Sequence, residues 1–575
     1  METTWKPRTV TAPRLAIRAS EVWLVLGVTI ALLAVTSIPY IYGYLTCPPD
    51  KWFSGIVYNM HDTGQYLSWM REAGTSFFTD NKLTAEPNAR VFVNLHWWIP
   101  GRLAHIFGLS FAQVYQAFRL LSIPLLTVAT YLFCALLFDN RRQRRFAFLL
   151  STFTSGLGWV WVVVKYATRA SELPFPHDVY TTPGNAFWVM VASPHLTLAA
   201  GLTVLVLFLA LLSVQRQRFG YALIAAVLAL FLGLGHIYDL VTVWAVLALF
   251  GLLVMLRDGW SWRTVFSLAI VVVASAPAAL YWGWVSSDAH PVWQQALAQY
   301  DNLGAFTPDP AHLVILLGLT FLLALVTFDG LVPLRRQTHG QLLVKSWFMI
   351  VPLLVYLPLH FQIMLLTGYT VPMGILAATG LFNHVLPWLR ERAVESRLRS
   401  WLTPARVNRV VPALFLLAVM LTNFYLLAWR VIDLRRHDYP FYLYRDEVAA
   451  MRWLDERTPP DEVVLSAFVP GHFIPGLSGD RAFLGNAVMT LDFNRKRAMV
   501  DAFFDPATSD TEREALVREY GIRCVFYGPA ERALGEYDPG ESPLFTEVFS
   551  SPRVKLYAVR EVSVQATSLS YRRGR

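Results

Sequence analysis

Residues Val22–Leu45 read VWLVLGVTIALLAVTSIPYIYGYL and contain no charged side chain. A helix needs about 20 apolar residues to cross a bilayer, so this segment is long enough to span one. It is also longer than the apolar core of a cleavable signal peptide. The segment therefore predicts an uncleaved first membrane span, and it sets the class of fold for the chain that follows.

The composition extends this interpretation to most of the chain. Apolar residues make up 55% of the 575 positions and charged residues 15%, and the mean hydropathy is +0.42. A soluble globular protein usually carries about 25% charged residues, so an ordinary soluble domain is excluded. We predict an α-helical polytopic membrane protein with about eleven transmembrane helices. Their ranges are Val22–Leu45, Phe111–Phe138, Phe146–Tyr166, Trp188–Val214, Tyr221–Gly235, Leu240–Leu256, Thr264–Val285, His312–Leu334, Leu342–Phe361, Ile363–Leu389 and Val410–Val431.

Lysine and arginine gather before the first span and in alternate loops after it. These basic residues are Lys6, Arg8, Arg14 and Arg18, then Arg141, Arg142, Arg144 and Arg145, then Arg216 and Arg218, Arg257 and Arg263, Arg335 and Arg336, and finally Arg390, Arg392, Arg397, Arg399, Arg406 and Arg409. By the positive-inside rule these segments are cytoplasmic. The first long loop, residues 46–110, is then extracytoplasmic, and so is the tail beyond Val431. Apolar residues at helical spacing predict two helices in this loop, Gly64–Gly74 and Leu95–Phe107. The sequence thus predicts a multi-pass protein of the cell (plasma) membrane with a cytoplasmic N-terminus.

The chain changes character at its last predicted span. Residues 433–575 carry 19 Lys and Arg against 22 Asp and Glu, whereas residues 1–432 carry 30 against 18. The excess of basic residues therefore belongs to loops that face anionic lipid headgroups, and we expect no nucleic-acid partner. Predicted helices at 446–457, 492–504 and 511–520 alternate with short strands at 463–467, 522–527, 545–549 and 554–559. We therefore predict a transmembrane domain over residues 1–432 and a soluble extracytoplasmic α/β domain over residues 433–575.

The stretch Tyr58–Leu67 (YNMHDTGQYL) places an acid, Asp62, just beyond the first span. A group-transfer site at a membrane surface requires a base that accepts a proton and cations that stabilise a departing anion. Asp62 is a candidate base. An arginine inside a span is costly, so Arg119 is expected to have an anionic partner or a phosphate. The alternative for Asp62 is a structural one, because an acid also suits the N-cap of a helix that begins there.

Further polar residues lie at the predicted outer ends of spans. His195 begins the fourth span, and His236, Tyr238 and Asp239 stand at the turn between the fifth and sixth, where a histidine and an acid require a partner or water. The alternative is that they are polar helix ends that meet the membrane interface. The candidate substrate-binding residues are His61, Tyr66, Arg90, His96, Arg102, Arg119, His195, His236, Tyr238 and Asp239.

Several motifs along the first third of the chain resemble one family. They are Asp62-x3-Tyr66-Leu67, Asn94-Leu95-His96-Trp97-Trp98, Leu103, Phe107-Gly108 and Ala117-Phe118-Arg119-Leu120-Leu121-Ser122. The pattern resembles the start of polytopic GT-C-fold glycosyltransferases of the protein O-mannosyltransferase and aminoarabinose-transferase kind. The tail is similar to the outer domain of bacterial members, at Trp453-Leu454-Asp455-Glu456-Arg457-Thr458-Pro459-Pro460 and Asp492-Phe493-x-Arg495-Lys496-Arg497. Two departures stand out: the family's paired acids are His61-Asp62 here, and two tryptophans follow His96 where the family has two prolines.

The resemblance implies a GT-C-like fold and an inverting transfer of a sugar from a polyprenyl-phosphate donor to an acceptor hydroxyl on the outer face. Asp62 would be the general base, and Arg119 with Arg90 or Arg102 would hold the phosphate. His96, His236 and Tyr238 would shape the sugar pocket. The implied partners are the lipid-linked sugar, a glycan, lipid or protein acceptor, and the bilayer.

Two questions stay open at this point. We expect no required cofactor; the alternative of a divalent metal rests on His61, Asp62, His177 and Asp178, which have suitable ligand atoms but no recognised spacing. The rival function is a transporter or flippase of lipid-linked saccharides, which favours internal repeats and broken helices at the membrane midplane, and the sequence shows no repeat. A non-catalytic scaffold has no need of a long, aromatic-rich first loop.

Overall fold

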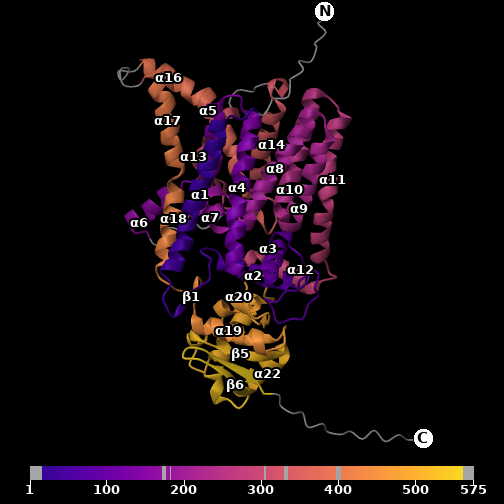
Figure 1. Ribbon diagram of the computed structural model, residues 1–575, viewed down its shortest axis with the longest axis vertical. Coiled ribbons are helices and arrows are strands. Elements are labelled where there is room, and N and C mark those ends of the chain that lie inside the picture. Colours follow the sequence, from indigo (N-terminus) through magenta and orange to yellow (C-terminus); the bar gives the residue numbers. More distant parts are fainter. Residues whose placement is uncertain are drawn as a thin grey trace, which may run out of the picture.

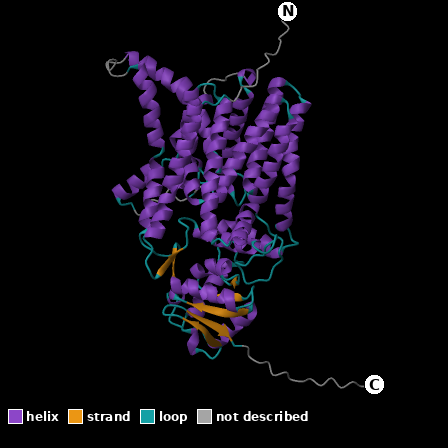
Figure 2. Ribbon diagram, viewed as in Figure 1, coloured by secondary structure: helices purple, strands orange, loops and turns teal. Residues whose placement is uncertain are grey.

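The computed structural model describes residues 16–170, 172, 177–179, 181, 183–303, 306–328, 334–395 and 403–560. Long helices form a bundle, and the segments that carry the sheets lie at one end of it (Figures 1 and 2). Residues between the first two long helices lie at the junction between the bundle and the C-terminal region (Figure 1). The candidate site is in this junction.

Seven helices in the described part of the chain are long and apolar enough to cross a membrane. They are α1 (Ala19–Leu45), α4 (Phe111–Leu137), α8 (Pro194–Arg216), α10 (Ile237–Asp258), α11 (Trp262–Val285), α13 (Pro310–Leu325) continued to Phe328, and α17 (Pro404–Val419) with α18 (Leu421–Leu434). The pair α5 (Arg141–Phe153) and α6 (Gly158–Thr168) is bent by 46° and makes an eighth span if counted as one. A multi-pass architecture is therefore present, but eleven spans are not confirmed.

The difference arises where an apolar run contains more than one helix or only a short one. The predicted span Trp188–Val214 is divided between α7 (Ala186–Ala192) and α8, of which only α8 is long enough to cross a membrane. The predicted separation of Tyr221–Gly235 from Leu240–Leu256 is confirmed by α9 (Phe219–Gly235) and α10, but α9 has only 17 residues. The predicted spans Leu342–Phe361 and Ile363–Leu389 also give shorter helices, namely α14 (His339–Leu354) and α15 (Thr370–Gly380), which is followed by α16 (Leu386–Glu395). Hydropathy locates apolar residues but does not show whether one full-length helix contains them.

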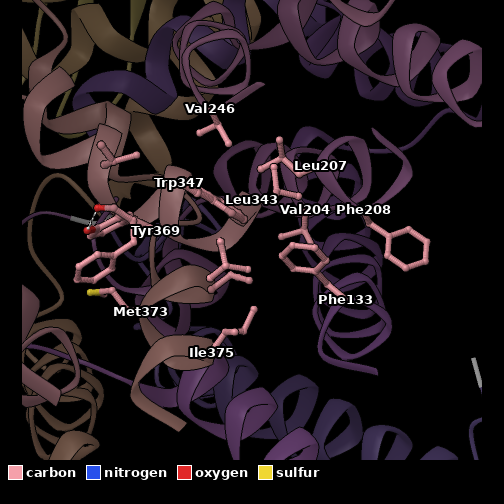
Figure 3. Close-up of a cluster of buried hydrophobic side chains, with 14 of the residues drawn as sticks. Phe133, Val204, Leu207, Phe208, Val246, Leu343, Trp347, Tyr369, Met373 and Ile375 are labelled. Carbon is pink, nitrogen blue, oxygen red and sulfur yellow. Dashed lines mark hydrogen bonds between the residues drawn. The ribbon is translucent and has the colours of Figure 1, made fainter. Parts of the chain in front are cut away.

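The bundle has an apolar interior and an apolar outer surface. Figure 3 shows Phe133, Leu207, Val246, Trp347 and Ile375 meeting between α4, α8, α10, α14 and α15, and all five are buried. On the outside, large apolar side chains are exposed along the helices, with Trp23 at 70%, Val273 at 70% and Leu280 at 72%. A surface of this kind is suited to lipid, because soluble proteins rarely expose extended apolar patches.

The loop between α1 and α4 is largely ordered secondary structure. It contains β1 (Lys51–Phe53), α2 (Met60–Ala73) and α3 (Leu95–Phe107). Asn94 caps α3 by accepting the backbone N–H of His96, and Gly108 ends the helix in the left-handed conformation at φ 63°. The predicted helix over Leu95–Phe107 is confirmed, and the predicted helix at Gly64–Gly74 begins four residues earlier, at Met60.

The C-terminal region contains a small mixed sheet with strand order β4-β3-β5-β7-β6. Its strands are β3 (Val463–Leu465), β4 (Arg481–Ala482), β5 (Ile522–Tyr527), β6 (Phe545–Ser550) and β7 (Lys555–Val559), and its helices are α19 (Arg445–Arg457), α20 (Phe468–Leu477), α21 (Phe493–Phe504), α22 (Asp510–Tyr520) and α23 (Pro529–Arg532). β3 pairs parallel with β4 and β5, and β7 pairs antiparallel with β5 and β6. The predicted strands at 545–549 and 554–559 and the helices at 446–457, 492–504 and 511–520 are confirmed within a few residues.

The C-terminal region is joined to the first loop by backbone pairing and by buried charges. β1 pairs antiparallel with β2 (Tyr442–Tyr444). Lys82, which is 2% exposed, forms an ion pair with Glu72 at 3.0 Å and donates to the Gly479 carbonyl at 2.6 Å. Arg481 forms an ion pair with Asp80. Since α2 also packs against α20, the helix that carries Asp62 is held between the bundle and the C-terminal region.

Candidate active site

Asp62 lies in the first turn of α2 and is half-buried. Asn59, at the N-cap, has a left-handed backbone (φ 47°, ψ 57°), a conformation that asparagine tolerates better than most residues. Its side-chain amide donates to Asp62 Oδ2 at 2.5 Å. The N-cap alternative for Asp62 is therefore wrong, because Asn59 occupies that position and Asp62 is inside the helix.

Asp62 lines a cavity between the end of the bundle and the C-terminal region. The cavity volume is about 90 Å³, and since a single buried water requires about 10–15 Å³, the cavity has room for more than one solvent molecule. The lining residues are Asn59, Asp62, Gln65, Tyr66, Trp69, Phe92, Asn94, Trp97, Ser193, His195, Leu196, Gly235, His236, Ile237, Tyr238, Trp282, Leu297, Tyr300, Met364, Val488 and Met489. Five candidate residues named from the sequence, Asp62, Tyr66, His195, His236 and Tyr238, are thus brought together from α2, α8 and the α9–α10 junction.

One wall of the cavity is a stack of rings. Tyr66 stacks on Trp97 with centroids 4.3 Å apart and an angle of 13° between planes. The Tyr66 hydroxyl lies 3.3 Å from His195 Nε2, whereas His195 Nδ1 is buried without a hydrogen-bond partner in the described part of the chain. Buried polar atoms are nearly always paired. The unpaired Nδ1 of His195 is therefore a candidate contact for a polar group of a ligand in this cavity.

A second feature is a histidine–carboxylate pair at a helix break. α9 ends at Gly235 and α10 begins at Ile237, so His236 lies between them with a non-helical backbone (φ −148°, ψ 81°). Its Nδ1 is 2.5 Å from Asp239 Oδ2. Asp239 is fully buried and His236 is 7% exposed. The predicted need of these two residues for a partner is therefore met, at least in part, by each other.

The environment of Asp62 favours the protonated acid. Burial raises the pKa of Asp62 to about 6, and the hydrogen bond from Asn59 partly opposes that rise. A general base works best when its pKa is near the working pH, and an ordinary aspartate, at about 3.9, is too weak for that. Asp62 is therefore suited to accept a proton near neutral pH.

The arginines expected to hold a phosphate do not line this cavity. Arg90 forms ion pairs with Glu72, Asp80 and Asp461, at 3.5, 3.5 and 3.6 Å. Arg102 donates to the carbonyl of Gly74 at 2.5 Å and lies over the Trp98 ring. Both are occupied by neighbouring parts of the protein, and this placement does not support their predicted contact with phosphate.

Arg119 is buried between α1 and α4, at 1% exposure. It donates to Thr36 Oγ1 at 2.7 Å, Ser37 Oγ at 2.9 Å and Gln116 Oε1 at 2.9 Å, and it lies over the Tyr40 ring. The expectation of an anionic protein partner is corrected: neutral oxygens and an aromatic face accommodate the guanidinium, as arginine's several donors and its affinity for ring faces allow.

Two histidine predictions have other outcomes. His96 is 1% exposed, does not line the cavity and packs against Phe231 with ring centroids 5.2 Å apart. Neither of its ring nitrogens has a partner among the described residues. The side chain of His61 lies outside the described residues. Among the described residues, no three His, Cys, Asp or Glu side chains form a group that could hold a metal ion.

Sequence reasoning missed part of the wall. Asn59, Asn94, Trp282, Tyr300, Val488 and Met489 line the cavity but were not candidates. Asn94 comes directly before the predicted helix Leu95–Phe107, so its residue type was a usable signal for a helix cap, whereas Asn59 caps a helix that begins four residues before the predicted start. Val488 and Met489 are apolar residues distant in sequence, and only the tertiary packing of the C-terminal region reveals them.

Two solved structures share the architecture over most of this chain. The Archaeoglobus fulgidus oligosaccharyltransferase, tethered with an acceptor peptide, aligns with a TM-score of 0.53 and 13% identity, over 93% of this chain and 74% of that one. An arabinofuranosyltransferase from Mycobacteria aligns with a TM-score of 0.53 and 14% identity, over 92% of this chain and 40% of that one. No family model and no curated protein matches the sequence. The likeness confirms the GT-C fold that the sequence motifs predicted.

Proposed function

We propose that this chain is an integral-membrane glycosyltransferase. It transfers a sugar from a polyprenyl-phosphate donor to an acceptor hydroxyl with inversion, and Asp62 is the general base. The observation that carries the proposal is the position of Asp62: a half-buried acid with a pKa raised to about 6 lines a cavity with aromatic and imidazole side chains. The fold is shared with two glycosyltransferases, which makes sugar transfer the chemistry to test first.

The reaction is a displacement at the anomeric carbon of the donor. The acceptor oxygen forms the new bond to that carbon while its proton passes to the Asp62 carboxylate. The bond between the anomeric carbon and the phosphate oxygen breaks, and its electron pair leaves with the phosphate. A polyprenyl phosphate is released, and Asp62 later loses its proton to water. One attack from the side opposite the departing oxygen inverts the configuration.

The ring wall supports binding of a sugar. Tyr66, Trp69, Trp97 and Trp282 give the cavity broad aromatic faces, while Asn94 adds an amide. Ligand sites commonly combine apolar and aromatic walls with a few polar groups that fix orientation. Val488 and Met489 close the cavity from the C-terminal region, so we propose that this region contacts the acceptor.

The direction of the chain in the membrane is part of the proposal. α5 begins with a basic run, Arg141–Arg145, and lies at the end of the bundle away from the sheet (Figure 1). If that end is cytoplasmic by the positive-inside rule, the cavity and the C-terminal region face the outer side. A lipid-linked donor on the outer leaflet then reaches Asp62 without crossing the membrane.

The test is transfer of radiolabelled sugar from a polyprenyl-phosphate donor by the purified protein in detergent. Asp62→Asn is expected to lower the rate by about 100-fold or more, as loss of a general base does. Asp288→Asn, at an exposed acid that accepts a hydrogen bond from Gln294, is the matched control and should retain the rate. Equal activity of the two variants would exclude Asp62 as the base.

A further inference from the structure

The cavity presents a charge problem for the proposed function. A leaving phosphate requires positive charge, yet no lysine or arginine is among the residues that line the cavity, all of which the structure describes. Arg90, Arg102 and Arg119 are engaged elsewhere. The side chains in this wall that can carry a positive charge are therefore the imidazoles of His195 and His236.

The two histidines differ in their partners. His195 lies near the Tyr66 hydroxyl through Nε2, and its Nδ1 is buried and unpaired. His236 has a carboxylate, Asp239 Oδ2, at 2.5 Å from Nδ1. Of the two imidazoles, His236 is therefore the one whose ring is paired with a carboxylate, and a carboxylate is the partner that suits a positively charged ring.

Asp239 itself requires a cation. It is fully buried, and its second oxygen, Oδ1, has no hydrogen-bond partner in the described part of the chain. A buried carboxylate without compensation is strongly destabilising. His236 is the ion-pair partner of Asp239, so the two buried side chains satisfy each other.

The geometry leaves one ring nitrogen of His236 for a ligand. Nδ1 lies 2.5 Å from Asp239 Oδ2, and among the described residues this is the hydrogen bond that the ring makes, so Nε2 is the nitrogen left over. His236 lines the same cavity as Asp62, but it comes from the α9–α10 break whereas Asp62 comes from α2. The base and this nitrogen thus belong to different parts of the wall.

We propose that His236 binds the phosphate of the lipid-linked donor through Nε2–H, with Asp239 as the positioning residue that fixes the ring through Nδ1. The inference rests on the proposed function, since it assigns the phosphate subsite of the same cavity. His236 thereby takes the part that the sequence motifs suggested for arginine. His236 is only 7% exposed, so a phosphate bound to it would face less competition from water than one bound to an exposed cation.

The experiment measures binding of a long-chain polyprenyl phosphate to the full-length protein in detergent, by quenching of tryptophan fluorescence. The polyprenol of equal length, which lacks the phosphate, and inorganic phosphate alone are titrated in parallel. His236→Gln keeps a donor but loses the charge, and we expect its affinity for the polyprenyl phosphate to fall about 10- to 100-fold, as for a lost charge-assisted hydrogen bond. Its affinity for polyprenol should stay within two-fold, on the order of experimental scatter.

Rescue and control variants separate this role from a structural one. His236→Arg restores a positive donor and should recover most of the affinity, and Asp239→Glu should bind better than Asp239→Asn. His312→Gln is the matched control, because His312 also lies three residues from an acid, Asp309, at 3.5 Å at a helix start, but outside the cavity. It should bind as the native protein does.

The outcomes are distinct. Unchanged binding of polyprenyl phosphate by His236→Gln overturns the inference. An equal loss of affinity for polyprenyl phosphate and for polyprenol also overturns it, because it indicates disturbed packing. Asp62→Asn should bind polyprenyl phosphate normally but transfer no sugar. If no sugar is transferred even by the native protein while binding depends on His236, the proposed function fails and the phosphate subsite stands.

Discussion

The hydrogen bond between Asn59 and Asp62 gives the most quantitative prediction. The Asn59 amide donates to Asp62 Oδ2 at 2.5 Å and lowers the pKa of that carboxyl, against the larger rise caused by burial. Removing the amide should therefore raise the pKa further. Glycine is the appropriate replacement, because position 59 has φ 47° and glycine adopts this conformation without strain.

The magnitude follows from the strength of the bond. A hydrogen bond to a charged group contributes about 1.5–3 kcal/mol, and Asn59 is exposed, so the lower value applies. At 1.36 kcal/mol per pKa unit, Asn59→Gly should raise the pKa of Asp62 from about 6 to roughly 7. Because the ionised carboxylate is the active form, the acid limb of the pH–rate profile moves upward by about one pH unit.

The assay is the rate of sugar transfer between pH 5 and pH 9. At pH 6 the native protein is half ionised at Asp62 and the variant about a tenth, so the variant should be roughly five-fold slower, and above pH 8.5 the two rates should be about equal. Gln217→Gly is the matched control, since it also replaces a left-handed residue (φ 52°) but lies at the far end of α8. An acid limb that stays in place or moves downward in Asn59→Gly refutes the assignment of that limb to Asp62.

Three further substitutions test the packing around the cavity. Lys82→Met leaves Glu72 buried without its closest cation, so the free energy of unfolding, followed by thermal melts, should fall by about 3–5 kcal/mol. The control Lys555→Met removes a more exposed ion pair and should lower it by about 1 kcal/mol or less. Gly101→Ala places a Cβ against the Met70 carbonyl, so it should separate α3 from α2, lower the melting temperature and reduce sugar transfer. The control Gly283→Ala has open space at its Cβ and should have none of these effects. Equal melting temperatures of the two variants would contradict the described packing of α3 on α2. Tyr66→Phe keeps the stack on Trp97 but removes the hydroxyl near His195. We expect an unchanged melting temperature and a transfer rate about five-fold lower, which corresponds to about 1 kcal/mol for one hydrogen bond. An unchanged rate would show that the Tyr66 hydroxyl has no part in transfer.

The sequence predicted those features that depend on local pattern. The first span, the helix over Leu95–Phe107 and the strands of the C-terminal sheet all follow from periodicity and turn residues, and the structure has them. Asp62 was found because it lies just beyond the first span and begins the motif Asp62-x3-Tyr66-Leu67, and His236 because a histidine within an apolar segment requires a partner.

Other features depend on contacts between segments that are distant in the chain, and such contacts cannot be predicted from local patterns in a single sequence. Arg90 lies in the same loop as Asp62, and charge alone suggested that it shares the site of Asp62. The structure instead pairs Arg90 with Glu72, Asp80 and Asp461, because the C-terminal region packs on this loop and supplies Asp461. Val488 and Met489 reach the cavity for the same reason.

The predicted count of eleven spans is not confirmed for a different physical reason. Hydropathy reports where apolar residues are, not whether one continuous helix contains them. Ser193 and His236 each separate two helices within an apolar stretch, and both residues line the cavity. These helix breaks are therefore also the places where polar side chains enter the site.

The position of a bound donor tests the central claim most directly. A structure of the protein with a non-transferable polyprenyl-phosphate sugar is expected to show the sugar in the cavity beside Tyr66 and Trp97, with its anomeric carbon separated from the Asp62 carboxylate by the width of one acceptor hydroxyl. A donor whose phosphate and sugar lie outside this cavity, with Asp62 facing only solvent, would contradict the account.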